Sequence, residues 1–117
     1  MIKQLMIING EPVDSSEGRY IEVINPATEE KIGEVAVASP IQVDEAVKVA
    51  AEAFKEWSEK SPFERAQLME KAALEVEKKA EEIGRIMTAE EGKPLKEAVG
   101  EVKGSAEVLR YFAEAGK

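Results

Sequence analysis

The chain has 117 residues, of which 44% are hydrophobic and 34% are charged, so we expect one globular domain rather than a disordered segment. Its formal net charge of −8 excludes nucleic acid as an expected partner, because an acidic surface repels phosphate backbones. The absence of Cys and His excludes disulfides and thiolate metal sites, and it leaves no imidazole to activate a nucleophile.

The sequence contains no sign of a membrane segment. No apolar run approaches the roughly 20 residues that cross a bilayer. The segment from Met1 to Gly10 lacks the apolar region and cleavage site of a signal peptide. Together with the lack of Cys, these features predict a cytoplasmic location, and the high content of Glu and Lys is compatible with a thermophilic source.

Residues 1–37 follow the pattern of two linked β-hairpins. The apolar run from Leu5 to Ile8 precedes Asn9-Gly10, a pair that tolerates the positive φ of a two-residue hairpin turn. Pro12 lacks an N–H, so the returning strand is expected to be short or at an edge. The second hairpin is predicted to join a strand from Tyr20 to Ile24 with a strand from Lys31 to Val37.

Residues 40–115 follow the pattern of three amphipathic helices. The first is predicted to begin at Ser39-Pro40, with Gln42 completing a capping box. The second is predicted to begin at Ser61-Pro62 and to run past Gly84, which is expected to weaken or bend it at a cost of about 1 kcal/mol relative to Ala. The apolar stripes are Val43, Val47, Ala50, Phe54 and Trp57 in the first helix, and Ala66, Met69, Ala73, Val76, Ala80, Ile83 and Met87 in the second.

The third helix is predicted to follow Gly92, a left-handed helix terminator, and to begin at Pro94. Its stripe is Leu95, Ala98, Val102, Ala106, Leu109 and Ala113. Gly100 and Gly104 in this helix indicate the close approach of another element.

Three such helices could form a small bundle on their own. A long coiled coil is disfavoured because Pro40, Pro62 and Pro94 divide the pattern.

The residues by themselves predict no catalytic constellation. The acidic side chains mostly alternate with Lys on helix faces, where Lys71 with Glu75, Glu75 with Lys79 and Lys78 with Glu82 are expected to form i,i+4 ion pairs. Nothing distinguishes a catalytic carboxylate pair from this charged surface. No Gly-rich phosphate-binding loop occurs.

Several short motifs nevertheless occur in a specific order. They are Asn25-Pro26-Ala27-Thr28-Glu29-Glu30, Glu91-Gly92-Lys93-Pro94 and Leu109-Arg110-Tyr111-Phe112-Ala113. Together they resemble the amino-terminal segment of the aldehyde dehydrogenase superfamily, and the resemblance extends from about Met6 to Ala115. It implies an α+β fragment that forms the leading part of an α/β cofactor-binding domain, with the hairpins in residues 1–37 and the helices in residues 40–115.

The resemblance implies that the parent protein oxidises an aldehyde to a carboxylic acid with NAD or NADP. In that family the nucleophilic Cys, the acid/base Glu and the cofactor loop all lie downstream of Lys117. No catalytic or cofactor-binding residue is therefore assigned here. This chain alone is expected to be inactive and to bind no cofactor.

Two roles implied by the resemblance fall on residues that are present. The first is a monovalent cation site formed by the backbone carbonyls of Val23 and Ile24 and the carboxylate of Glu90. The family often has Asp at the position of Glu90, and the alternative is that Glu90 is an ordinary surface acid. The second role is the lining of the aldehyde tunnel by Gly100 and Gly104, which would leave the tunnel wide enough for a polar or bulky aldehyde.

The apolar helix faces predict a partner. They are expected to pack on the remainder of the dehydrogenase or, in this chain alone, to drive self-association into a homo-oligomer or leave residues 1–37 partly disordered. The end of the chain at Ala115-Gly116-Lys117 is interpreted as truncation. The alternative is a stand-alone helical interaction module without enzymatic activity.

Overall fold

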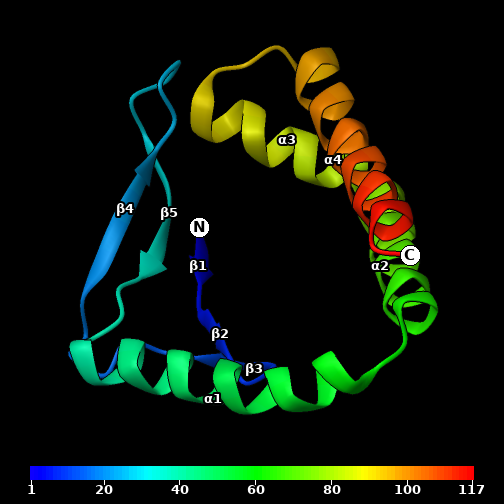
Figure 1. The fold of residues 1–117 in the computed structure, drawn as a ribbon. Coiled ribbons are helices and arrows are strands. Elements are labelled where there is room, and N and C mark those ends of the chain that lie inside the picture. The colour runs from blue at the N-terminus through cyan, green and yellow to red at the C-terminus, as the bar shows by residue number, and fades with distance from the viewer. The chain divides into compact units, whose positions relative to one another are not determined.

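The computed structural model describes residues 1–117 and divides the chain into two compact units, Met1–Trp57 and Ser58–Lys117 (Figure 1). The strands are β1 (Ile2–Gln4), β2 (Met6–Ile8), β3 (Glu11–Val13), β4 (Tyr20–Ile24) and β5 (Lys31–Ala36). The helices are α1 (Pro40–Glu59), α2 (Pro62–Lys78), α3 (Ala80–Glu91) and α4 (Leu95–Ala115). This order confirms an α+β chain with hairpins before helices.

The first hairpin forms as predicted between β2 and β3. Asn9 and Gly10 adopt positive φ angles of 55° and 77°, which turn the chain within two residues. The antiparallel register places Met6 opposite Val13 and Ile7 opposite Pro12. Since the sheet has only two strands, Pro12 interrupts no further ladder.

The second sheet contains the predicted β4–β5 hairpin and an unpredicted strand. Its order is β1-β5-β4, and β1 runs parallel to β5 with Ile2 opposite Gly33. A Cβ on Gly33 would lie 2.7 Å from the carbonyl oxygen of Ile2, so a larger residue would separate the two strands. Gly33 is therefore required by the pairing with β1.

The motif that begins at Asn25 forms the turn between β4 and β5. The Asn25 side chain accepts a hydrogen bond from the Ala27 N–H at 2.9 Å, and the Glu29 N–H donates to the Asn25 carbonyl at 2.8 Å. Glu29 has a positive φ of 61°. The turn is thus held by local side-chain and backbone bonds.

Gln42 joins α1 to the loop that follows β3. The predicted capping box is formed, since the Ser39 N–H donates to Gln42 Oε1 at 3.0 Å and the Gln42 N–H donates to Ser39 Oγ at 3.2 Å. The Gln42 amide also donates to the Asp14 carbonyl at 2.8 Å and accepts from the Ser16 N–H at 3.2 Å. Gln42 is 7% exposed, and these partners satisfy the polar atoms of its buried amide.

In the second unit, the predicted second helix is two helices, so the chain has four helices rather than three. The break is at Lys79, whose N–H is shared between the carbonyls of Glu75 and Val76 at 3.3 and 3.2 Å. Ala80, the first residue of α3, is only 2% exposed. The bend allows both α2 and α3 to pack on α4 (Figure 1).

The contact between these helices is built from alanines. They are all at most 5% exposed and form what we call the alanine seam: Ala66, Ala73 and Ala80 on one side, and Ala98, Ala106 and Ala113 on α4. Because each side chain is a single methyl group, the helix axes can lie closer than larger residues would allow. Val102 is the one larger residue buried on α4 beside them.

Gly84 provides the closest approach between α3 and α4. A Cβ on Gly84 would lie 2.6 Å from Val99 Cγ2 and 3.1 Å from the Val99 backbone nitrogen. Nothing in this chain lies within 4 Å of a Cβ on Gly100 or Gly104. The close approach predicted at those two glycines is therefore wrong for this chain and occurs at Gly84, which also does not bend its helix.

The start of α2 and the end of α3 form at the residues that the sequence predicted. Ser61 and Glu64 form a reciprocal capping box at the start of α2, with bonds of 2.7 and 3.2 Å. Gly92 ends α3 with a φ of 79°, and its N–H donates to the Thr88 carbonyl. Lys93 then forms an ion pair with Glu101 of α4, which ties the turn to that helix.

Alanine substitutions at Gly84 and Gly100 distinguish the effect of close packing on stability from the effect of helix propensity. Gly84→Ala is expected to destabilise the chain, since overpacking costs about 1–3 kcal/mol and the gain in helix propensity is about 1 kcal/mol. Gly100→Ala should instead stabilise it by about 0.5–1 kcal/mol, because its Cβ enters open space. Denaturant unfolding of both variants measures the difference, and stabilisation by Gly84→Ala would contradict the packing.

Candidate functional site

The three predicted cation ligands lie in different units. Val23 and Ile24 end β4, and a register shift in the pairing with β5 falls between them. Such a bulge disturbs the ladder and can leave a carbonyl oxygen available, which suits a cation that binds oxygen donors. Glu90 is exposed in the last turn of α3. Because Glu90 belongs to the second unit and the two carbonyls belong to the first, the shared site stays a prediction.

The acidic side chains form no metal-binding cluster within either unit. No group of three or more Asp or Glu residues is arranged to hold a metal ion in this chain. The predicted i,i+4 pairs of Glu75 with Lys71 and Lys79 are not formed, because Glu75 pairs with Lys78 at 2.7 Å. This i,i+3 pair lowers the pKa of Glu75 through the hydrogen bond from Lys78.

Gly100 lies in a surface hollow of about 570 Å³, which we call the Gly100 hollow. Its lining residues are Glu81 of α3 and Leu95, Lys96, Val99, Gly100 and Lys103 of α4. Gly104, the other predicted tunnel residue, lies one helical turn further along α4 and does not line the hollow. The structure therefore places one of the two predicted glycines in a concave surface.

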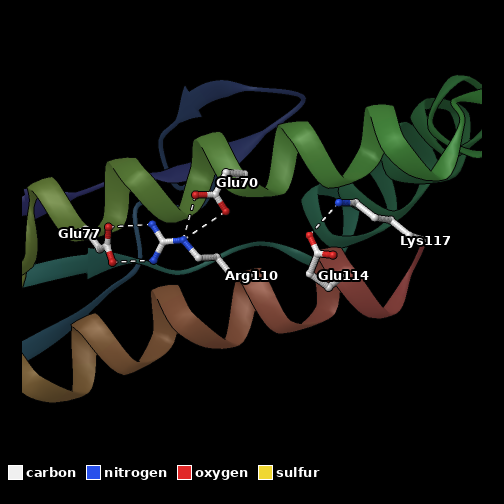
Figure 2. Close-up of polar contacts among 5 residues, drawn as sticks. All are labelled: Glu70, Glu77, Arg110, Glu114 and Lys117. Carbon is white, nitrogen blue, oxygen red and sulfur yellow. Dashed lines mark hydrogen bonds and ion pairs between the residues drawn. The ribbon is translucent and has the colours of Figure 1, made fainter.

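A second concave surface lies between the first part of α2 and the end of α4. It has a volume of about 330 Å³ and is lined by Phe63, Ala66, Gln67, Glu70, Ala113, Glu114 and Lys117. Lys117 pairs with Glu114 at 2.7 Å, as Figure 2 shows, and lies 6.0 Å from the centre of the Phe63 ring. The amino group of Lys117 is therefore held in an ion pair at the edge of this concave surface.

Arg110 forms an ion-pair cluster with Glu70 and Glu77 across the α2–α4 contact (Figure 2). Its Nε donates to Glu70 at 2.9 Å, and its two terminal nitrogens donate to the two oxygens of Glu77 at 2.6 and 2.8 Å. This two-bond geometry with Glu77 requires the planar guanidinium and could not be reproduced by Lys. Arg110 lies in the motif Leu109-Arg110-Tyr111-Phe112-Ala113, and the spacing of that motif alone indicates no partner for it.

The cluster alters the ionisation of its members. The hydrogen bonds from Arg110 hold the pKa of Glu77 below its usual value, and the two carboxylates raise the pKa of Arg110. All three side chains are between 30% and 47% exposed, so solvent screens their attraction. We infer that the cluster has a structural role, in which its ion pairs add to a contact between α2 and α4 that helix packing sets.

Large apolar side chains remain uncovered on the helices. Five of these side chains are between 57% and 69% exposed: Val47, Phe54, Phe63, Tyr111 and Phe112. Val47 and Phe54 belong to the first unit, and Phe63, Tyr111 and Phe112 belong to the second, so each unit carries exposed apolar side chains on a helix. None of the helices combines the length and the apolar content that a membrane crossing requires.

Comparison with known proteins identifies the family. The sequence profile of the aldehyde dehydrogenase family matches residues 13–117, so the chain belongs to the aldehyde dehydrogenase family. The fold agrees: NADP-dependent glyceraldehyde-3-phosphate dehydrogenase from Bacillus halodurans superposes with a TM-score of 0.92 at 32% identity, over 96% of this chain and 24% of that one. Both results confirm the resemblance found in the sequence.

Two relatives by sequence are succinate-semialdehyde dehydrogenases. The mitochondrial enzyme of Arabidopsis thaliana is 38% identical over 95% of this chain, and the NADP⁺ enzyme of Escherichia coli is 34% identical over the whole of this chain. The chain spans only 21% and 24%, respectively, of these two proteins.

Acid titration tests the Arg110 cluster. Because the pKa of Glu77 is lowered in the folded state, its contribution to stability is present above the ordinary carboxylate pKa of about 4.5 and is lost as the pH falls through its lower folded value. Glu77→Gln should therefore lower the melting temperature at pH 7 and show a smaller further loss on acidification. Glu82→Gln, which removes an exposed α3 carboxylate, is the control, and identical pH profiles for both variants would contradict the assignment.

Proposed function

We propose that this chain is the amino-terminal part of an NAD(P)-dependent oxidoreductase that converts an aldehyde to a carboxylic acid, and that it is inactive alone. One observation carries the proposal: residues 13–117 match a family, and this chain spans only 21% and 24% of the two compared relatives. The chain contains no Cys, so a thiolate nucleophile would have to come from another part of the parent protein.

The residues of this chain do not fit a nicotinamide cofactor. When bound, that group accepts the hydride that leaves the aldehyde carbon. A dinucleotide site uses a Gly-rich turn between a strand and a helix to hold the pyrophosphate. No such turn is present between residues 1 and 117, so we assign NAD or NADP to the remainder of the parent.

We assign two supporting roles to this chain. Gly100 and Gly104 line the path of the aldehyde, where the missing side chains leave room for a polar or bulky substrate. The open space at both positions and the hollow at Gly100 support this role. The names of the relatives, which act on a semialdehyde or a phosphorylated aldehyde, agree with it.

The second supporting role is a structural cation site. The carbonyls of Val23 and Ile24 and the carboxylate of Glu90 would supply oxygen donors to Na⁺ or K⁺, with a further ligand from the rest of the parent. We expect K⁺ to raise the melting temperature of the complete dehydrogenase, and Glu90→Gln to remove that effect. A variant that keeps the full response would show Glu90 to be an ordinary surface acid.

The exposed apolar faces of the helices supply the partner surface. We expect them to pack on the remainder of the dehydrogenase in a homo-oligomeric parent, and to drive self-association when this chain is alone. The cytoplasmic location and the thermophilic source stay predictions from composition.

Light scattering over a concentration series, with and without NAD, tests the proposal together with an assay for reduced nicotinamide. The expected result is an oligomer that grows with concentration, ignores NAD and oxidises no aldehyde. Tight binding of NAD would contradict the assignment of the cofactor site to the remainder. A stable monomer at all concentrations would favour a self-sufficient helical interaction module.

A further inference from the structure

We propose that Asn9 is a site of spontaneous deamidation, and that the folded turn between β2 and β3 withholds it from the reaction until this hairpin opens. The evidence is the pair Asn9-Gly10, its exposure to solvent and the backbone angles of the turn. The inference lies outside the proposed function, because it involves no aldehyde, cofactor or partner.

The reaction needs only the two residues of the turn and water. The backbone nitrogen of Gly10 attacks Cγ of Asn9, the new N–Cγ bond closes a succinimide ring, and the side-chain nitrogen leaves as ammonia with the proton of the Gly10 N–H. Water then opens the ring at either of its two carbonyls, which gives aspartate or isoaspartate. Asn9 and Gly10 are both exposed, and nothing lies within 4 Å of a Cβ on Gly10, so the turn is open to water.

The only other asparagine of the chain provides an internal comparison. Asn25 is followed by Pro26, whose ring nitrogen carries no N–H and cannot close a succinimide. The Asn25 side chain is also held in the turn between β4 and β5, where it accepts a hydrogen bond from the Ala27 N–H at 2.9 Å. The same amide chemistry is therefore blocked at Asn25 and permitted at Asn9.

The folded turn keeps the two reacting atoms apart. Positive φ angles of 55° and 77° at Asn9 and Gly10 are those of a type I′ turn. In such a turn ψ at the first central residue is about 30°, which holds the following nitrogen almost anti to Cβ. Ring closure requires the Gly10 nitrogen and the Asn9 Cβ to be nearly eclipsed about the Cα–C bond. The hairpin must therefore open before Asn9 reacts.

Opening of this hairpin costs little free energy. Its sheet has only two strands, and each strand contributes three residues to the pairing. Such a ladder is marginal by itself, and weakly held elements open far more often than a whole domain unfolds. Ile8, beside the turn, is 9% exposed and is the one buried residue of these two strands.

One of the two products makes the opening permanent. In isoaspartate the main chain runs through Cγ, so the turn gains a methylene group. A two-residue turn fixes the register in which Ile8 lies opposite Glu11, and the longer backbone no longer fits that register. Both products also add one negative charge to a chain of net charge −8. We therefore expect the pairing of β2 with β3 to be lost in the isoaspartate form.

Peptide mapping by mass spectrometry of the whole 117-residue chain, aged at mildly alkaline pH with and without urea, tests the inference. Trypsin places the two asparagines in separate peptides, Gln4–Arg19 and Tyr20–Lys31. We expect the mass gain of deamidation at Asn9 in the first peptide and none in the second. Urea, which opens the hairpin, should accelerate the reaction at least about tenfold.

Two variants separate the steps of the reaction from its effect on the hairpin. Asn9→Gln keeps an amide but would have to close a larger and less favourable ring, so it should show no mass gain at this position. Asn9→Asp carries the charge of the products without the longer backbone. Amide hydrogen exchange should show β2 and β3 protected in freshly prepared Asn9→Asp and unprotected in the purified isoaspartate form. Equal protection in these two samples would overturn the effect assigned to the added methylene group.

The remaining outcomes are also decisive. No mass gain at Asn9 in urea, or an equal gain at Asn25, would overturn the assignment of the site. Equal rates with and without urea would overturn the protection by the folded turn. The readout requires no catalysis, so a failure of the proposed function would leave it unaffected.

Discussion

The close contact of α4 with α2 and α3 is the constraint on which the second unit depends. It requires the alanine seam and Gly84 to present almost no side-chain volume between the helices. Once the helices lie this close, Arg110 of α4 can reach Glu70 and Glu77 of α2 at hydrogen-bond distance. The ion pairs follow from the packing, since exposed charges alone contribute too little to hold two helices together.

Features fixed by a few neighbouring residues could be predicted from the sequence. Asn9-Gly10 formed its turn, Ser39 and Ser61 formed their capping boxes, and Gly92 ended a helix in the left-handed region. In each case the chemistry that decides the structure lies within about four residues. Such a signal does not depend on what the rest of the chain does.

Features that depend on distant partners could not be predicted in the same way. The bend at Lys79 has no Gly or Pro at the break, and the helices on both sides of it pack on α4, which is a contact between residues distant in the sequence. The parallel pairing of β1 with β5 joins residues about thirty positions apart, so no local sequence pattern predicts it. It requires a glycine at position 33, where a side chain would collide with the carbonyl of Ile2. Gly84 was expected to weaken its helix because intrinsic propensity says nothing about Val99.

Helix α4 also combines features that could be predicted from the sequence with features that could not. The family resemblance indicated both Gly100 and Gly104, but only the three-dimensional structure shows that Gly100 lines a surface hollow and that Gly104 does not. At about 100° per residue, Gly100 lies about 200° around α4 from Ala98 of the alanine seam. One face of the helix is therefore committed to close packing, and the roughly opposite face is left open. Substitutions on the open face can change what α4 contacts without disturbing the packing that holds it in place.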